Sequence, residues 1–157
     1  ELFYQIGILF YQYAIKSTEN PYSDDNKQLY SKAQEALDYS IEVYPTAEAY
    51  AARANVKKMV RDYGGAILDC DRAIELAPDY YRGYFIRGDV KILGIRATAN
   101  ERRAFQELGA NAGDLVSKAL LDYEEAYKLS NQKMYQELKN QLITKITEYV
   151  ERKGAFP

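Results

Sequence analysis

Apolar and small side chains between residues 47 and 80 recur with two helical periods. Tyr50 and Ala54 belong to one stripe, and Ala66, Cys70 and Ala73 belong to a second stripe. Apolar residues spaced by three and four positions are typical of helices that bury one face. The letters RDYGG at 61–65 favour a turn, and a proline follows the second stripe where a helix cannot continue. The pattern predicts two packed helices joined by a turn.

A similar skeleton occurs on both sides of this stretch. Its aromatic, small and proline positions upstream are Phe3, Gly7, Tyr30, Ala33, Leu37, Ser40 and Pro45. Those downstream are Tyr84, Gly88, Ala119, Tyr123 and Ala126. Small residues at fixed positions suit two helices that approach closely. The chain therefore contains an internal repeat, with long insertions in its first and third copies.

The middle copy, 47–80, resembles the tetratricopeptide repeat, a helix–turn–helix unit of 34 residues. Tyr50, Ala54, Tyr63, Ala66, Ala73 and Pro78 carry the resemblance at places 4, 8, 17, 20, 27 and 32 of that unit. The resemblance implies an all-α fold, a right-handed superhelical stack of three repeats at about 1–46, 47–80 and 81–130. It also implies a single domain over 1–157. We count places from Ala47 as place 1 and use the same count in the other two copies.

The segment 131–153 predicts one further helix, which does not continue the repeat. Its apolar residues recur every four positions, at Met134, Leu138, Leu142, Ile146 and Val150. Repeat arrays need a terminal helix with a polar outer face. We interpret this segment as that capping helix. Tyr135 and Ile143 lie off the stripe, so a dimer face is the alternative.

Charges at two places of the repeat occur together or not at all. Repeats two and three have arginine at place 7, Arg53 and Arg87, and aspartate at place 23, Asp69 and Asp122. Repeat one lacks both charges. A half-buried arginine without a counterion is costly, so such a pair is kept or lost as a unit. We predict the contacts Arg53–Asp69 and Arg87–Asp122.

The segment 2–15, LFYQIGILFYQYAI, is apolar on almost every side. It is too short to span a bilayer and contains two glutamines. We expect a buried helix and no membrane segment. The composition, 47% hydrophobic and 28% charged, is typical of a soluble globular protein and does not indicate a compartment.

The residue inventory offers little for catalysis. The chain has no histidine, which removes Ser-His-Asp, Cys-His and Cys/His zinc arrangements. Adjacent carboxylates, as at Asp24–Asp25, do not face each other on a helix. Cys70, the only cysteine, stands at place 24, where the other copies have Leu37 and Tyr123. We expect a core cysteine, and we expect no enzyme activity, catalytic residue, cofactor or metal.

The resemblance implies a concave groove, lined by the first helix of each repeat, that holds a protein or peptide. The candidate groove residues are Tyr4, Ile8, Tyr11, Asn55, Lys58, Arg82, Phe85 and Asp89. One subfamily grips C-terminal carboxylates of chaperones through five places, which here hold Tyr4, Ile8, Ala52, Arg82 and Ile86. Only one of the five is basic, so we do not expect that specificity. The alternative is that the aromatic side chains of this set pack against the insertions or a flanking segment.

Other functions remain open as alternatives. The insertion 95–114 predicts a helix at its centre, ended by Gly109, with Asp114 as the next N-cap. It, or the C-terminal helix, could serve self-assembly, with the chain a monomer or weak dimer. RNA binding is a distant third, carried by Arg96, Arg102, Arg103 and Phe105. Nucleic acid is disfavoured as a partner because the net charge is -2.

Overall fold

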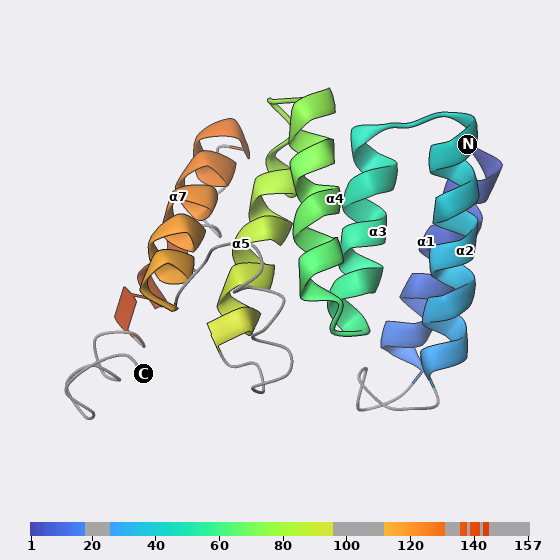
Figure 1. The fold of residues 1–157 in the computed structure, drawn as a ribbon, viewed down its shortest axis with the longest axis horizontal. Helices are drawn as coiled ribbons and strands as arrows, with labels where there is room; N and C mark the ends of the chain where they lie inside the picture. The colour runs from blue at the N-terminus through green and yellow to red at the C-terminus, as the bar shows by residue number, and fades with distance from the viewer. Residues whose placement is uncertain (18–25, 96–111, 131–135, 138, 142, 145–157) are drawn as a thin grey trace. The chain divides into compact units, whose positions relative to one another are not determined.

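The structure, a computed structural model, describes residues 1–17, 26–95 and 112–130, together with the short stretches 136–137, 139–141 and 143–144. Six helices occur in these ranges (Figure 1). They are α1 (Leu2–Lys16), α2 (Lys27–Val43), α3 (Ala47–Met59), α4 (Tyr63–Leu76), α5 (Tyr81–Ile95) and α7 (Ala112–Ser130). The described residues contain no strand, as predicted for an all-α fold.

The chain divides into two compact units, Glu1–Pro78 and Asp79–Pro157. The first contains repeats one and two, and the second contains repeat three. The single domain over 1–157 therefore stays a prediction, and each unit is described by itself.

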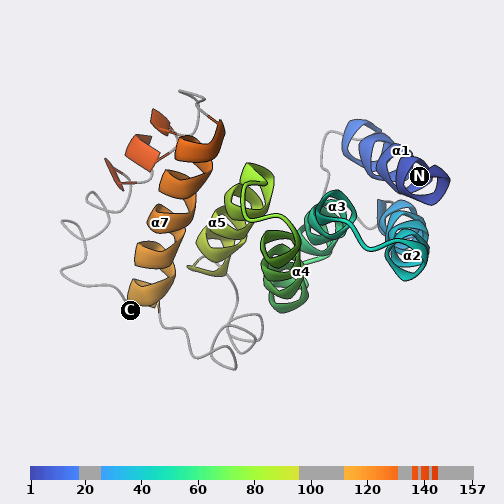
Figure 2. The ribbon, with the colours of Figure 1, turned by 90° about the horizontal axis from the view of Figure 1, so that it is seen from above.

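In the first unit, α1 packs on α2, α2 on α3, and α3 on α4 (Figures 1 and 2). The core between the two repeats combines small side chains with larger ones such as Tyr30 and Leu37. It contains Ala14, Tyr30, Ala33, Leu37, Ala52 and Val56. Helices that present alanine at a contact can approach closely, which explains why these places hold small residues. The predicted packing of two successive helix pairs is present in this unit.

The turn between α3 and α4 is shorter than predicted. Only Val60, Arg61 and Asp62 lie between the two helices, and both glycines of RDYGG belong to the first turn of α4. Arg61 has φ 66°, which turns the chain, and the Asp62 side chain accepts a hydrogen bond from the Gly65 N–H at 2.9 Å. A Cβ on Gly65 would collide with that carboxylate. The glycine thus permits an N-cap and does not break the helix.

The expectation that α1 is buried is wrong. Only Gly7 and Ala14 of α1 are buried, and the side of Leu2, Leu9 and Tyr13 is exposed. No described helix covers that side, so its apolar side chains remain at the surface. Within the described part of the chain, none of the helices is long and apolar enough to cross a membrane.

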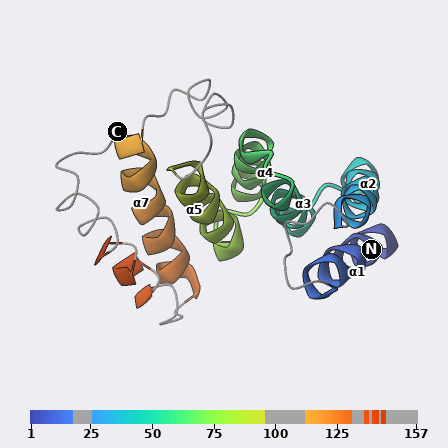
Figure 3. The same ribbon diagram turned by 90° about the horizontal axis from the view of Figure 1, so that it is seen from below.

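In the second unit, α5 packs along α7 (Figure 3). Val90 of α5 and Ala119 and Ala126 of α7 are fully buried. Asp114 lies in the first turn of α7, which begins at Ala112, so its predicted role as N-cap is wrong. Acid in a first turn still suits the helix dipole. The centre of the 95–114 insertion, the pair Asp24–Asp25 and most of the predicted capping helix lie outside the described residues.

Cys70 is fully buried, and as the only cysteine of the chain it forms no disulfide within the chain. Its counterparts at place 24, Leu37 and Tyr123, are buried too. The prediction of a core cysteine is confirmed, because place 24 faces the paired helix in all three repeats. A free cysteine packs there as a small hydrophobic side chain.

Candidate peptide-binding surfaces

Both predicted arginine–aspartate pairs are present. Arg53 donates from Nε and Nη2 to the two carboxylate oxygens of Asp69, at 2.8 and 2.7 Å. Arg87 donates from Nη2 to Asp122 at 2.7 Å and from Nε at 3.1 Å. Two parallel N–H···O bonds give a guanidinium–carboxylate pair both strength and fixed orientation. These arginines join the two helices of their own repeat.

A lysine completes each pair. Lys57 lies 2.9 Å from Asp69, and Lys91 lies 2.6 Å from Asp122. Both aspartates are buried, so each carboxylate is compensated by two cations within its repeat. The hydrogen bond from Arg53 to Asp69 raises the pKa of Arg53 above its already high ordinary value, against the effect of burial. These lysines stand at place 11, where repeat one has Phe10.

The aromatic residue at place 4 covers the same arginine in both repeats. The Arg53 guanidinium lies 5.4 Å from the Tyr50 ring centroid, and that of Arg87 lies 5.5 Å from Tyr84. A cation above a tyrosine ring is attracted electrostatically by the quadrupole of the ring. We call each set of tyrosine, arginine, lysine and aspartate an ionic cluster, and the two clusters repeat the same contacts.

Five of the predicted groove residues lie on α1 and α3 of the first unit. Tyr4, Ile8 and Tyr11 of α1 are half-buried and pack against the core of the first unit. Asn55 and Lys58 of α3 are also half-buried, and α1 contacts α3. The surface contains aromatic, aliphatic, amide and cationic groups on two adjoining helices. Such a mixture is typical of protein recognition surfaces.

The three predicted groove residues of α5 are partly engaged within their own unit. Asp89 accepts a hydrogen bond from the Tyr123 hydroxyl at 2.7 Å, and the Phe85 ring lies 5.9 Å from the Tyr123 ring. Burial, followed by the Asp89 charge, raises the pKa of Tyr123. Arg82 is exposed, with Tyr81 as a neighbour at 3.4 Å. A hydrogen bond with Tyr81 raises the pKa of Arg82.

The chaperone-type places are not arranged to hold a carboxylate in the first unit. Tyr4, Ile8 and Ala52 are apolar or aromatic, and Ala52 is buried in the core. In the second unit Ile86 is buried and Arg82 is the basic member. No group of three or more acidic or sulfur side chains that could hold a metal ion occurs among the described residues.

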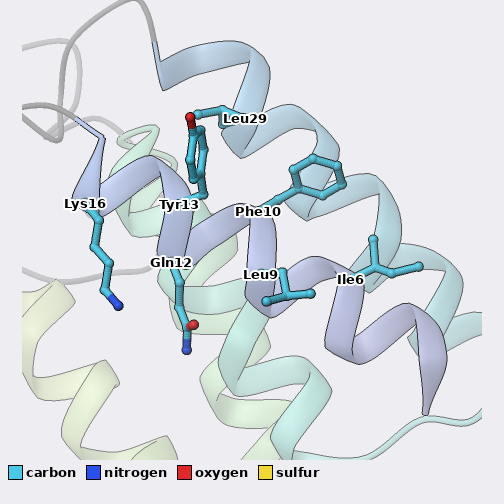
Figure 4. A pocket seen from close by; sticks show the side chains of 7 residues that line it. All are labelled: Ile6, Leu9, Phe10, Gln12, Tyr13, Lys16 and Leu29. Carbon is cyan, nitrogen blue, oxygen red and sulfur yellow. The ribbon is translucent and has the colours of Figure 1, made fainter.

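The outer side of α1 carries an open hollow that the sequence analysis missed (Figure 4). Its volume is about 620 Å³. It is lined by Ile6, Leu9, Phe10, Gln12, Tyr13, Lys16 and, from α2, Leu29. The sequence of residues 2–15 contained an indication of this hollow, because a helix of these residues has apolar side chains on two opposite sides. We interpreted that pattern as complete burial.

Comparison with known proteins supports the repeat assignment. No family model matches the chain. The small glutamine-rich tetratricopeptide repeat-containing protein 2 of Saccharomyces cerevisiae is 32% identical over 124 residues, which cover 71% of this chain. The chain spans about a third of that protein, 35% of its length.

Solved structures with a similar fold are tetratricopeptide domains. The first such domain of human RPAP3 has a TM-score of 0.59 and 16% identity, covering 92% of this chain and 94% of that one. The first domain of Spaghetti (RPAP3), bound to the HSP90 peptide SRMEEVD, has a TM-score of 0.59 and 17% identity, covering 92% and 98%. The TPR2B domain of yeast Sti1, in complex with pHsp70, has a TM-score of 0.63 and 20% identity, covering 95% and 99%.

The repeat places and the helix pairs agree with these similarities, and the predicted all-α fold class is confirmed. The chain has the tetratricopeptide-repeat fold.

Proposed function

We propose that this chain is a non-enzymatic adaptor that binds a protein or peptide segment on the inner side of α1 and α3. The observation that supports it is the set of half-buried side chains at places 5, 9 and 12 of two adjoining helices. Tyr4, Ile8 and Tyr11 come from α1, and Asn55 and Lys58 come from α3. We call this set the inner surface. Phe85 and Asp89 occupy places 5 and 9 on α5 and Arg82 occupies place 2, and these three are second-rank candidates.

The chemistry of the inner surface favours an extended segment with apolar side chains. Tyrosine supplies a large contact area at a low entropy cost, and partly exposed aromatics are common anchors at interfaces. The Asn55 amide can donate to and accept from a peptide backbone, which gives affinity with little sequence preference. Lys58 favours an acidic residue in the bound segment.

We propose that the peptide specificity differs from that of the two similar domains with bound chaperone ligands. The Spaghetti domain binds an HSP90 peptide that ends in EEVD, and the Sti1 domain is in complex with pHsp70. In this chain the five places of the carboxylate-binding subfamily contain a single basic residue, Arg82. An acidic C-terminus would be desolvated there without enough counterions. We therefore propose a partner recognised through apolar and backbone contacts.

Selection from a phage-displayed library of random 12-residue peptides on the full chain tests this function. We expect enriched peptides to contain aromatic or aliphatic residues, and their affinity to fall about tenfold in Tyr11→Ala and in Asn55→Ala. Leu121→Ala, an exposed leucine of α7, is the matched control. The same chain should not bind the peptide SRMEEVD in calorimetry. Tight binding of SRMEEVD, or peptides insensitive to both inner-surface changes, would contradict the proposal.

A further inference from the structure

Helix α1 has a second apolar side, opposite the inner surface. Leu2, Leu9 and Tyr13 lie roughly half a helical turn away from Tyr4, Ile8 and Tyr11. Leu2 is 69% exposed and Leu9 is 64% exposed. We call the side of Leu2, Ile6, Leu9, Phe10 and Tyr13 the outer surface. Exposed apolar side chains gathered on one helix face usually mark an interaction site.

The internal repeat shows what covers this side of a first helix. The counterparts of Leu2 and Leu9 on α3, at places 3 and 10, are Ala49 and Val56. Ala49 is 1% exposed and Val56 is 0% exposed. Val56 belongs to the core together with residues of α2, such as Leu37. In repeat two, the second helix of the preceding repeat thus covers the side that is open in α1.

The residue at place 7 defines the chemistry of a helix that can cover α1. In repeat two, Arg53 at this place reaches across to Asp38 of the covering helix α2, at 2.7 Å. In repeat one the same place holds Ile6, which lines the hollow between α1 and α2 (Figure 4). An aspartate placed over Ile6 would lose water without gaining a cation. A helix that covers α1 therefore needs an apolar residue where α2 has Asp38.

We propose that the outer surface of α1 binds an amphipathic helix of a partner protein. The helix lies on α1 as α2 lies on α3, with its apolar stripe on Leu2, Leu9 and Tyr13 and an uncharged residue over Ile6. This is a helix-in-groove contact of the kind in which apolar anchors recur at helical spacing. It is a second site, on the opposite side of α1 from the inner surface.

Two synthetic peptides and the full chain test this inference. The probes are residues 27–44 of this chain, once with the native sequence and once with Asp38→Leu. We expect the Asp38→Leu peptide to bind more tightly in calorimetry. Leu9→Glu in the protein should weaken that binding about tenfold or more, because the change places a charge in the apolar contact. Leu68→Glu, which changes an exposed leucine of α4, should leave the affinity unchanged within about twofold.

The variant Ile6→Arg gives the most specific result. It gives repeat one the arginine that repeat two has at place 7. The protein should then bind the native peptide, which has Asp38, more tightly than the Asp38→Leu peptide. Circular dichroism of each variant verifies that it is folded. Absence of binding by the Asp38→Leu peptide, or an unchanged preference in Ile6→Arg, would overturn the inference. Self-association of the chain that Leu9→Glu abolishes would also overturn it, because a second copy would then be the occupant.

Discussion

Repeat one and repeat two build the same helix pair with opposite chemistry between their helices. Places 7, 11 and 23 hold Ile6, Phe10 and Ala36 in repeat one. The same places hold Arg53, Lys57 and Asp69 in repeat two. Repeat three follows repeat two, with Arg87, Lys91 and Asp122 joined in the same way. The three residues change together, which indicates that they form one unit of stability.

The difference extends to the aromatic residue at place 4. Phe3 stacks on Tyr39 with ring centroids 5.1 Å apart, whereas Tyr50 lies against the Arg53 guanidinium. The two helices of a repeat can therefore be joined by either apolar or ionic contacts, provided that the residues at places 7, 11 and 23 are all of the same kind. A mixed set would leave a buried charge without a counterion, which is the costly case.

The largest expected effect comes from breaking the ionic cluster of repeat two. Asp69→Ala leaves Arg53 and Lys57 half-buried without their shared carboxylate. We expect the free energy of unfolding to fall by about 3 kcal/mol, measured by urea denaturation followed by circular dichroism.

Copying the residues of repeat one into repeat two sharpens the same comparison. The triple variant Arg53→Ile, Lys57→Phe and Asp69→Ala should recover most of the stability that Asp69→Ala alone loses, because an apolar set of similar volume often replaces an ion pair at little cost. A triple variant less stable than Asp69→Ala would show that the two sets are not interchangeable.

A smaller effect distinguishes the repeats at place 8. In Gly7→Ala the added Cβ would lie 2.6 Å from Leu37 Cγ, and in Gly88→Ala it would lie 3.0 Å from the Tyr123 ring. Alanine gains about 1 kcal/mol in helix propensity at either position. We expect Gly7→Ala to lose about 1–2 kcal/mol of stability in thermal or urea unfolding, because Leu37 is fully buried and cannot move aside. Gly88→Ala should be closer to neutral, and the reverse order would contradict the packing described here.

A further comparison concerns places 9 and 24. Tyr123 and Asp89 are hydrogen-bonded in repeat three, whereas repeat two has Cys70 and Asn55 at these places. Tyr123→Phe should lower the free energy of unfolding by about 1 kcal/mol, measured by urea denaturation.

The contribution of Tyr123 to stability depends on pH, because folding raises the pKa of Tyr123 above 10.0. The folded state keeps the proton above that pH while the unfolded chain loses it, so this contribution is present below pH 10 and declines as the pH rises. Tyr123→Phe should therefore be less sensitive to alkaline pH than the parent chain.

The smallest perturbation probes the buried thiol of repeat two. Cys70 should react with a thiol reagent far more slowly in the native chain than in urea, because the reagent needs an exposed thiolate. Absorbance of the released leaving group gives both rates. Equal rates would mean that place 24 is open to solvent.

The sequence predicted the features that depend on periodicity and on paired changes. Helix spacing and prolines gave the helix pairs, and the joint absence of Arg and Asp from repeat one predicted the bonds of Arg53 and Arg87. The role of Cys70 followed from its place opposite the paired helix. These inferences use local geometry and repeat symmetry, which the letters contain directly.

Other features needed the three-dimensional arrangement. The two glycines of RDYGG suggested a turn. In the structure the Asp62 side chain accepts a hydrogen bond from the Gly65 N–H as the N-cap of α4, and both glycines belong to that helix. The contacts of Lys57 and Lys91 were not predicted, because nothing in the letters shows that these lysines reach the buried aspartates. Apolar residues around α1 predicted burial, yet a helix is buried on a given side only when another element covers it.

The most direct test of the central claim is an NMR titration of the isotope-labelled full chain with a peptide selected from the library. Binding at the inner surface predicts the largest shift changes at the methyl groups of Ile8 and the side-chain amide of Asn55, with Leu9 and Leu121 nearly unchanged. Shift changes centred on Leu9 or Leu121, with Ile8 and Asn55 unaffected, would contradict the proposal that the inner surface of α1 and α3 binds the partner.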